Sequence, residues 1–163
     1  YETRYGDSQR TSRWRKGLNN SQGYAPKIIY YMITVLFQTE THFPVNRKKI
    51  KNALAAVLEK KIRRGVEVSV AIVGDRRMRE LNRTYRNIDA TTDVLSFPLS
   101  DPLYSHDQPF VDAPDDVLRL GDIINSYPQA IASATEENKL VDDVIVSLAL
   151  HGLDHLLGIH HEE

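Results

Sequence analysis

The chain has 163 residues, of which 41% are hydrophobic and 26% charged, a composition typical of one globular domain with its own core. No apolar run approaches the roughly 18 residues that a membrane span needs, and the N-terminus lacks the apolar segment of a signal peptide, so we expect a cytoplasmic protein without membrane association. Because the chain has no cysteine, disulfides and thiolate metal sites are excluded, and any metal ion must be bound by imidazole, carboxylate or water.

Charge is unevenly distributed along the chain. Residues 1–31 contain six Lys or Arg and two acidic residues, a net charge of +4, so the remaining residues carry −5 of the formal total of −1. The first 23 residues are rich in Gly, Ser, Asn and Arg without an apolar period, which is typical of a flexible tail. We therefore expect residues 1–31 to form a basic flexible extension, either native or translated from upstream of the true start, and residues 32–163 to form the domain.

The predicted elements begin with a strand at residues 33–37, where β-branched and aromatic residues follow one another. A helix should start after Asn46, a suitable N-cap residue, because apolar residues then recur at helical spacing until Gly65 ends the helix. Residues 66–73 alternate between apolar and polar at first and then become apolar. This pattern predicts a second strand with a buried end.

The central part of the chain predicts another helix and another strand. Asp75 is expected to cap a helix that continues through residues 76–86. A short strand is predicted at residues 94–97, and Pro98 should end it. Residues 98–117 are rich in Pro, Asp and Ser and show no period, so we expect a surface loop, and a loop of that length is often functional.

The C-terminal part adds a strand and two helices. The strand is predicted at residues 120–124, and a helix should follow over residues 127–138, with Pro128 in its first turn. The last helix should run from Val141 to Gly158. Together the elements predict an α+β domain, in which a small mixed sheet of four strands packs with four to five helices.

The string HGLDHLLGIHH holds the candidate metal ligands. His151 and His155 are four residues apart in the last predicted helix, so they project from one face, one turn apart, and can share a cation. His161 follows Gly158, where a chain reversal can return it to the same ion. Three imidazoles leave a tetrahedral zinc ion one open position, as in catalytic zinc sites, where the bound water has a pKa of roughly 7. We therefore predict one catalytic Zn²⁺ bound by His151, His155 and His161.

These histidines have two other possible interpretations. Histidines near a helix C-terminus also interact favourably with the helix dipole, but three of them at this spacing favour a metal ion. The spacing also matches the metzincin peptidases, in which a glutamate directly after the first histidine is the general base. Gly152 occupies that position here, which argues against peptide hydrolysis by that mechanism. His160 is ambiguous, whereas His42 and His106 are expected at the surface.

Three segments, in the same order along the chain, carry a resemblance to a known family. Residues 151–161 align with a signature of roughly H-G-x-L-H-L-x-G-Y-D-H, and residues 81–98 (LNRTYRNIDATTDVLSFP) and 120–123 (LGDI) resemble two further elements. By these motifs, the sequence resembles the YbeY family of bacterial and organellar endoribonucleases, which act in ribosomal RNA maturation. The resemblance covers the chain from Met32 to the C-terminus.

The resemblance implies roles for individual residues. His151, His155 and His161 carry over as metal ligands, and Arg86 carries over as the functional arginine of the family. This role is chemically reasonable, because a guanidinium suits phosphate oxygens and stabilises the charge that develops on a phosphodiester under attack. Without the motif, Arg86 would be an ordinary arginine at a helix end.

Several positions near these motifs are open or depart from the family pattern. Thr92, Asp93 and Ser96 are candidates for the lining of a cleft, and the alternative is that Asp93 caps a turn while its apolar neighbours fill the core. Family members usually have leucine where Asp154 stands, and Asp154 either orients a ligand histidine or faces solvent. They usually have a hydrophobic residue where Asn125 stands.

The function that the resemblance implies is a zinc-dependent, single-strand-specific endoribonuclease in rRNA maturation, including 16S rRNA 3′-end processing, and in ribosome quality control. Its implied partners are single-stranded RNA and the small ribosomal subunit or its assembly factors. Because the domain is acidic, we expect a local basic groove for RNA around Arg86, with a solvated helix face as the alternative. The groove should include Arg76, Arg77, Arg79 and Arg83. The alternative functions are a zinc metallohydrolase of peptides or small molecules and a non-catalytic ribosome-assembly factor.

Overall fold

The computed structural model describes residues 9–19, 27–99 and 116–159. The strands are β1 (Gln9–Asn19), β2 (Lys27–Thr39), β3 (Gly65–Val73), β4 (Val94–Pro98) and β5 (Val117–Ser126). The helices are α1 (Arg47–Lys61), α2 (Asp75–Arg86), α3 (Tyr127–Glu137) and α4 (Val141–Leu156). None of the helices in these ranges is both long and apolar enough to cross a membrane.

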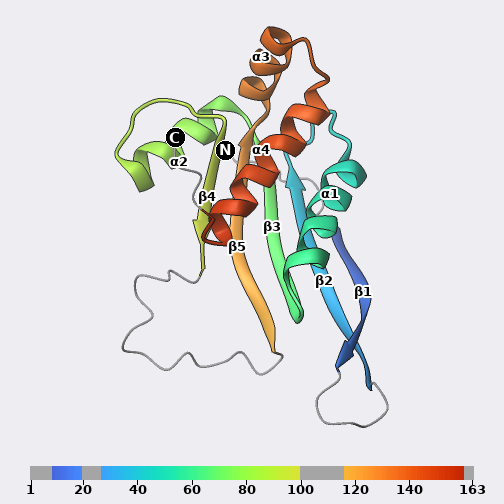
Figure 1. Ribbon diagram of the computed structural model, residues 1–163. Coiled ribbons are helices and arrows are strands. Elements are labelled where there is room, and N and C mark those ends of the chain that lie inside the picture. The colour runs from blue at the N-terminus through green and yellow to red at the C-terminus, as the bar shows by residue number, and fades with distance from the viewer. Residues whose placement is uncertain (1–8, 20–26, 100–115, 160–163) are drawn as a thin grey trace.

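The five strands form one mixed sheet in the order β1-β2-β3-β5-β4 (Figure 1). The three inner strands β2, β3 and β5 are parallel, and the two edge strands β1 and β4 pair antiparallel with their neighbours. Parallel strands need a crossover connection, and α1 supplies the one between β2 and β3. The predicted α+β class is therefore confirmed, with the four predicted strands as β2 to β5.

The sheet is covered on both faces. Its larger core lies against α1, α3 and α4, and α1 and α4 lie side by side in front of the sheet in Figure 1. A smaller core lies on the other face, where Met78 and Leu81 of α2 pack with Val73 and Leu95. Val94 packs into the larger core and Leu95 into the smaller one, because successive side chains of β4 point to opposite faces. Edge strand β4 is therefore flanked by α4 on one face and α2 on the other.

Strand β1 lies in the segment for which we expected a flexible extension. It pairs with β2 from Gln9 opposite Phe37 to Asn19 opposite Lys27, so the expected domain start at Met32 falls inside a strand. An edge strand of this kind is held by hydrogen bonds between its backbone and the backbone of the neighbouring strand. Every residue except proline has both a backbone N–H and a backbone C=O group, so such pairing does not require apolar side chains. The absence of an apolar period in this segment therefore did not exclude a strand.

Several predicted helix boundaries are confirmed. The Asn46 side chain caps α1 by accepting a hydrogen bond from the Lys49 N–H at 3.0 Å. Pro128 lies in the first turn of α3, and Gly158 follows α4 with a φ of 74°, the left-handed conformation typical of a glycine that ends a helix. Most of the predicted loop at residues 98–117 lies outside the described residues.

Two predicted boundary roles are wrong. Gly65 does not end the first helix, because α1 stops at Lys61 and Gly65 is the first residue of β3. Asp75 does not cap the second helix either, because Gly74 is the N-cap residue and Asp75 is the first residue of α2. The Asp75 carboxylate instead accepts hydrogen bonds from side chains outside α2.

Candidate active site

His151 and His155 lie exposed on the last turns of α4, with their rings in edge-to-face contact. Their Nε2 atoms are 3.0 Å apart, and their ring centroids are 4.5 Å apart at an interplanar angle of 82°. Two nitrogen ligands of one tetrahedral zinc ion would be about 3.3 Å apart, given Zn–N bonds of about 2.0–2.1 Å. The same separation also suits an N–H···N hydrogen bond between two neutral imidazoles. The pair therefore fits two ligands of one metal ion after a shift of a few tenths of an ångström.

The third predicted ligand, His161, lies outside the described residues, as do His160 and His106. Within the described ranges, no group of three His, Cys, Asp or Glu side chains is arranged to hold a metal ion. After α4 the chain turns at Gly158, and the Ile159 N–H donates to the Asp154 carbonyl at 2.9 Å.

Gly152 holds the histidine-bearing turn of α4 close to the sheet. A Cβ atom at this position would lie 2.7 Å from Cγ2 of Ile123 and 3.5 Å from Cγ2 of Val94, so no larger residue fits without a shift. A glutamate here, where a metzincin has its general base, would have to enter the core between α4 and the sheet. The structure thus gives a packing reason for the glycine that argued against a peptidase.

Polar contacts align α4 with α1. The Lys61 ammonium lies 3.3 Å from the Asp154 carboxylate, and the Asn46 N–H donates to the Asp142 carboxylate at 3.0 Å. These contacts join the two helices near their C-terminal and N-terminal ends respectively. Asp154, which departs from the family pattern, thus has a lysine partner on α1 and is not simply facing solvent.

Asp93 caps the turn that precedes β4, as one of the two interpretations expected. Its carboxylate accepts a hydrogen bond from the Val94 N–H at 2.7 Å, and its carbonyl accepts one from the Ser126 N–H at 2.8 Å. Asp93 also lines a cavity of about 260 Å³, together with α3 and α4 residues that include Ser147. Ser147 lies one helical turn before His151, so this cavity adjoins the histidine-bearing part of α4.

Asn125, the other departure from the family pattern, is fully buried between β5 and α4. Its amide donates to the Ile145 carbonyl at 3.2 Å, whereas its Oδ1 atom has no hydrogen-bond partner among the described residues. A buried polar atom without a partner costs about 1–3 kcal/mol. This asparagine thus links α4 to the sheet at an energetic cost that a hydrophobic residue would avoid.

Arg86 is the last residue of α2 and is exposed. No carboxylate in the described part of the chain forms an ion pair with it. Because α2 and α4 flank β4 on opposite faces of the sheet, Arg86 and the histidine pair lie on helices of different layers. The structure therefore brings His151 and His155 together and places Arg86 on the helix that covers the other face of the sheet.

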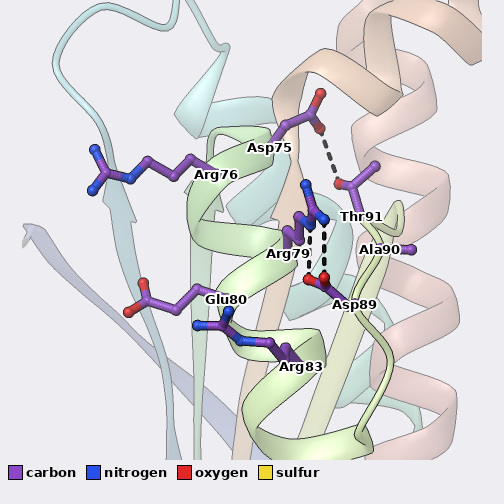
Figure 2. Close-up of a pocket in the computed structure, with 8 residues that line it drawn as sticks. All are labelled: Asp75, Arg76, Arg79, Glu80, Arg83, Asp89, Ala90 and Thr91. Atoms are coloured by element: carbon purple, nitrogen blue, oxygen red, sulfur yellow. Dashed lines mark hydrogen bonds and ion pairs between the residues drawn. The ribbon is translucent and has the colours of Figure 1, made fainter.

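The groove expected along α2 is present, but its lining is not basic. It has a volume of about 940 Å³ and lies between α2 and the turn that follows it (Figure 2). Its charged lining consists of Arg76, Arg79, Arg83, Asp75, Glu80 and Asp89, so the formal charges cancel. The fourth expected arginine, Arg77, does not line the groove and pairs with Glu80 at 2.8 Å. The expectation of a local basic groove is therefore wrong as to its charge, because Asp75 and Glu80 of α2 and Asp89 of the following turn balance the three arginines.

A network around Asp75 was not foreseen from the sequence. Its carboxylate accepts hydrogen bonds from Thr91 at 3.0 Å, Ser126 at 2.9 Å and Gln129 at 3.1 Å. Burial is the largest single effect and raises the pKa of Asp75, but the bonds from Gln129, Ser126 and Thr91 together outweigh it and lower the pKa. The network joins the start of α2 to the start of α3. Its members are too far apart in the sequence for any local motif to indicate it.

Comparisons with known proteins agree on one family. A family model described as Endoribonuclease YbeY matches residues 35–163. The protein of that name from Chloroflexus aurantiacus is 38% identical over 131 residues, which are 80% of this chain and 82% of the relative. The Endoribonuclease YbeY from Anaeromyxobacter sp. is 40% identical over 115 residues, which are 71% of this chain and 54% of the relative. The one from Moorella thermoacetica is 45% identical over 96 residues, 59% of this chain and 60% of the relative.

One solved structure is also similar. The solution structure of TM1509 from Thermotoga maritima is 29% identical in sequence, covers 71% of this chain and 66% of its own, and has a TM-score of 0.48. The region that the family model matches contains α1 to α4 and all four predicted site residues, Arg86, His151, His155 and His161.

Proposed function

Since the chain belongs to the endoribonuclease YbeY family and is an endoribonuclease by that membership, we propose that it is a zinc-dependent enzyme that cuts single-stranded RNA in ribosomal RNA maturation. The proposed substrate is the 3′ end of 16S rRNA, the proposed compartment is the cytoplasm, and the proposed partner is the small ribosomal subunit or its assembly factors. The proposed ligands are His151, His155 and His161, with Arg86 at the scissile phosphate.

The observation that carries the metal dependence is the separation of 3.0 Å between the Nε2 atoms of His151 and His155. Imidazole nitrogen is a preferred ligand of zinc, and a chain without cysteine has no thiolate to offer. Both rings are exposed, so a cation and a substrate can reach them from solvent. A zinc ion bound there would supply a Lewis acid for a phosphoryl oxygen and would activate water.

The residues of the chain have separate tasks in this proposal. Two interactions position α4. The close approach of Gly152 to Ile123 sets the distance between the helix and the sheet, and the ion pair between Lys61 and Asp154 aligns the helix with α1. The two imidazoles are thus positioned before substrate binds. No described carboxylate forms an ion pair with the Arg86 guanidinium, which offers a fork of N–H donors. It can therefore form paired hydrogen bonds with phosphate oxygens as negative charge develops on them.

The proposed function is tested by incubating metal-loaded protein with labelled single-stranded RNA. His155→Ala and Arg86→Ala should each lower the cleavage rate by about 100-fold or more, as the loss of a charge-stabilising group does in other enzymes. The matched controls are His42→Ala and Arg63→Ala, which remove an exposed histidine and an exposed arginine elsewhere and should leave the rate unchanged. Cleavage that survives both site substitutions would refute the assignment of these residues.

The same preparation separates the alternative functions. A metal-loaded chain that hydrolyses peptides and leaves RNA intact would make it a peptidase and overturn the proposal. A chain that binds zinc and RNA but cuts neither substrate would be a non-catalytic assembly factor. Co-sedimentation with small ribosomal subunits tests the proposed partner. If the chain cleaves RNA but does not co-sediment with the subunits, the proposed partner is wrong and the proposed activity is unaffected.

A further inference from the structure

Four arginines of α2 lie on one side of the helix. Arg76, Arg79, Arg83 and Arg86 are separated by three, four and three residues. At about 100° and 1.5 Å per residue, they fall within an arc of about 80° and extend over about 15 Å along the helix axis. The first three line the groove beside α2, and Arg86 follows in the same row towards the end of the helix. We call these four residues the arginine row.

The charges of the groove are not equally available to a ligand. Asp89 holds Arg79 through two hydrogen bonds of 2.8 and 3.0 Å, which Figure 2 shows as two dashed lines. Glu80 accepts a hydrogen bond from Arg77, which lies outside the groove, and Asp75 accepts three hydrogen bonds from neutral side chains. All three acidic side chains of the groove therefore already have donors.

The remaining arginines of the row have no such partner. In residues 9–19, 27–99 and 116–159, no carboxylate forms an ion pair with Arg76, Arg83 or Arg86. Figure 2 shows the side chains of Arg76 and Arg83 extending from α2 before and after Arg79 along the helix. The groove thus has cancelling formal charges, but the cations without a carboxylate partner are arranged in one row that leads to Arg86.

We propose that the arginine row binds the sugar-phosphate backbone of the RNA strand next to the cleavage site, with Arg76 and Arg83 contacting phosphates distant from the scissile one. This inference rests on the proposed function, because that function places Arg86 at the scissile phosphate. A guanidinium offers a fork of donors that matches phosphate oxygens, and contacts of this kind hold a strand without reading its sequence.

The proposed function favours RNA over an acidic protein segment as the ligand, because an enzyme that cuts RNA must bind the strand that it cuts. Tyr85 precedes Arg86, is 65% exposed, and packs edge-on against Phe97 with ring centroids 5.0 Å apart. At about 100° per residue, this ring lies about 100° around the helix from Arg86, on the side of α2 that faces the sheet. Tyr85 therefore lies outside the arginine row.

The test is the salt dependence of RNA binding, measured by fluorescence anisotropy on the full chain with labelled single-stranded RNA and a chelator to prevent cleavage. Each phosphate contact with a single strand contributes about 0.7 to the slope of log K against log salt concentration. The double variant Arg76→Gln/Arg83→Gln should therefore reduce the slope by about 1.4 and weaken binding by about tenfold at low salt. Both side chains are exposed, so the melting temperature should not change, and this serves as the check on folding.

The matched control removes two positive charges elsewhere. Lys48 and Lys60 are exposed residues of α1, and Lys48→Gln/Lys60→Gln should leave both the slope and the affinity unchanged. Asp89→Asn gives a change of opposite sign, because it releases Arg79 for a phosphate and should raise both the slope and the affinity. If the arginine double variant has the slope of the wild type, or if the lysine double variant loses as much, the proposal is wrong.

The outcomes also separate this inference from the proposed function. If the wild-type protein cleaves RNA and the variant Arg76→Gln/Arg83→Gln binds RNA as tightly as the wild type, the proposed role of the arginine row is wrong. The proposed function is then unaffected. Protein that binds RNA through the row but never cleaves it would support the row and overturn the function. If a glutamate-rich peptide of equal charge binds through Arg76 and Arg83 at least as tightly as RNA, the groove is a protein-docking site and the inference is wrong.

Discussion

A Cβ atom on Gly152 would lie 2.7 Å from Cγ2 of Ile123, so α4 touches β5 at a point where any residue larger than glycine requires a shift. Ile123 is fully buried in the core beneath α4. Gly152 directly follows His151 and lies three residues before His155. The contact between the glycine and the isoleucine therefore sets the height of the histidine pair above the sheet.

Gly152→Ala should lower the free energy of unfolding by about 1 kcal/mol. Overpacking a core costs about 1–3 kcal/mol, and the better helix propensity of alanine returns about 1 kcal/mol. The measurement is urea unfolding followed by far-UV circular dichroism. In an Ile123→Ala background, which lacks the obstructing methyl group, the same substitution should no longer destabilise. Equal losses in both backgrounds would show that the contact does not limit this position.

Gly121→Ala should destabilise the chain more strongly, by about 3 kcal/mol or more. Gly121 has a φ of 135°, and a Cβ atom there would lie 2.1 Å from the Phe97 carbonyl oxygen of β4. Gly65→Ala is the control, because its Cβ atom would meet no atom closer than 3.4 Å, and it should be nearly neutral. Thermal unfolding compares the two variants, and a similar melting temperature for both would contradict the strand geometry.

Asp75→Ala should lower the free energy of unfolding by roughly 1–3 kcal/mol at neutral pH, because it removes the acceptor of three side-chain donors. The pKa of Asp75 is lowered in the folded chain relative to about 3.9 in the unfolded chain. Its contribution is therefore complete above pH 4 or so and is lost as the pH falls through the folded-state pKa. Urea unfolding at several pH values should show wild type and variant converging below about pH 4, and a constant difference would contradict the network.

The sequence was sufficient to predict features that depend on local spacing. The four-residue interval between His151 and His155 predicted two rings on one face of a helix, and their Nε2 atoms lie 3.0 Å apart. Asn46 was recognisable as a cap because its acceptor and its donor, the Lys49 N–H, are three residues apart. Both relationships follow from helix geometry alone.

Features that depend on distant parts of the chain were not predictable in this way. Asp75 was expected to cap a helix because nothing in the sequence indicates that Ser126 and Gln129, more than fifty residues later, donate to it. The ion pair between Arg79 and Asp89 likewise depends on how the turn after α2 folds back. Strand β1 was missed because backbone pairing with β2 leaves no apolar signature.

In the proposed function, cleavage of RNA depends on a metal ion bound at the end of α4. The most direct measurement is the rate of cleavage of labelled single-stranded RNA by chelator-treated protein before and after zinc is added back, for wild type and His155→Ala. We predict no cleavage by either protein after chelation, recovery of the wild type on addition of zinc, and no recovery of the variant. Cleavage by the chelated wild type at its original rate, or equal recovery of His155→Ala, would contradict the claim.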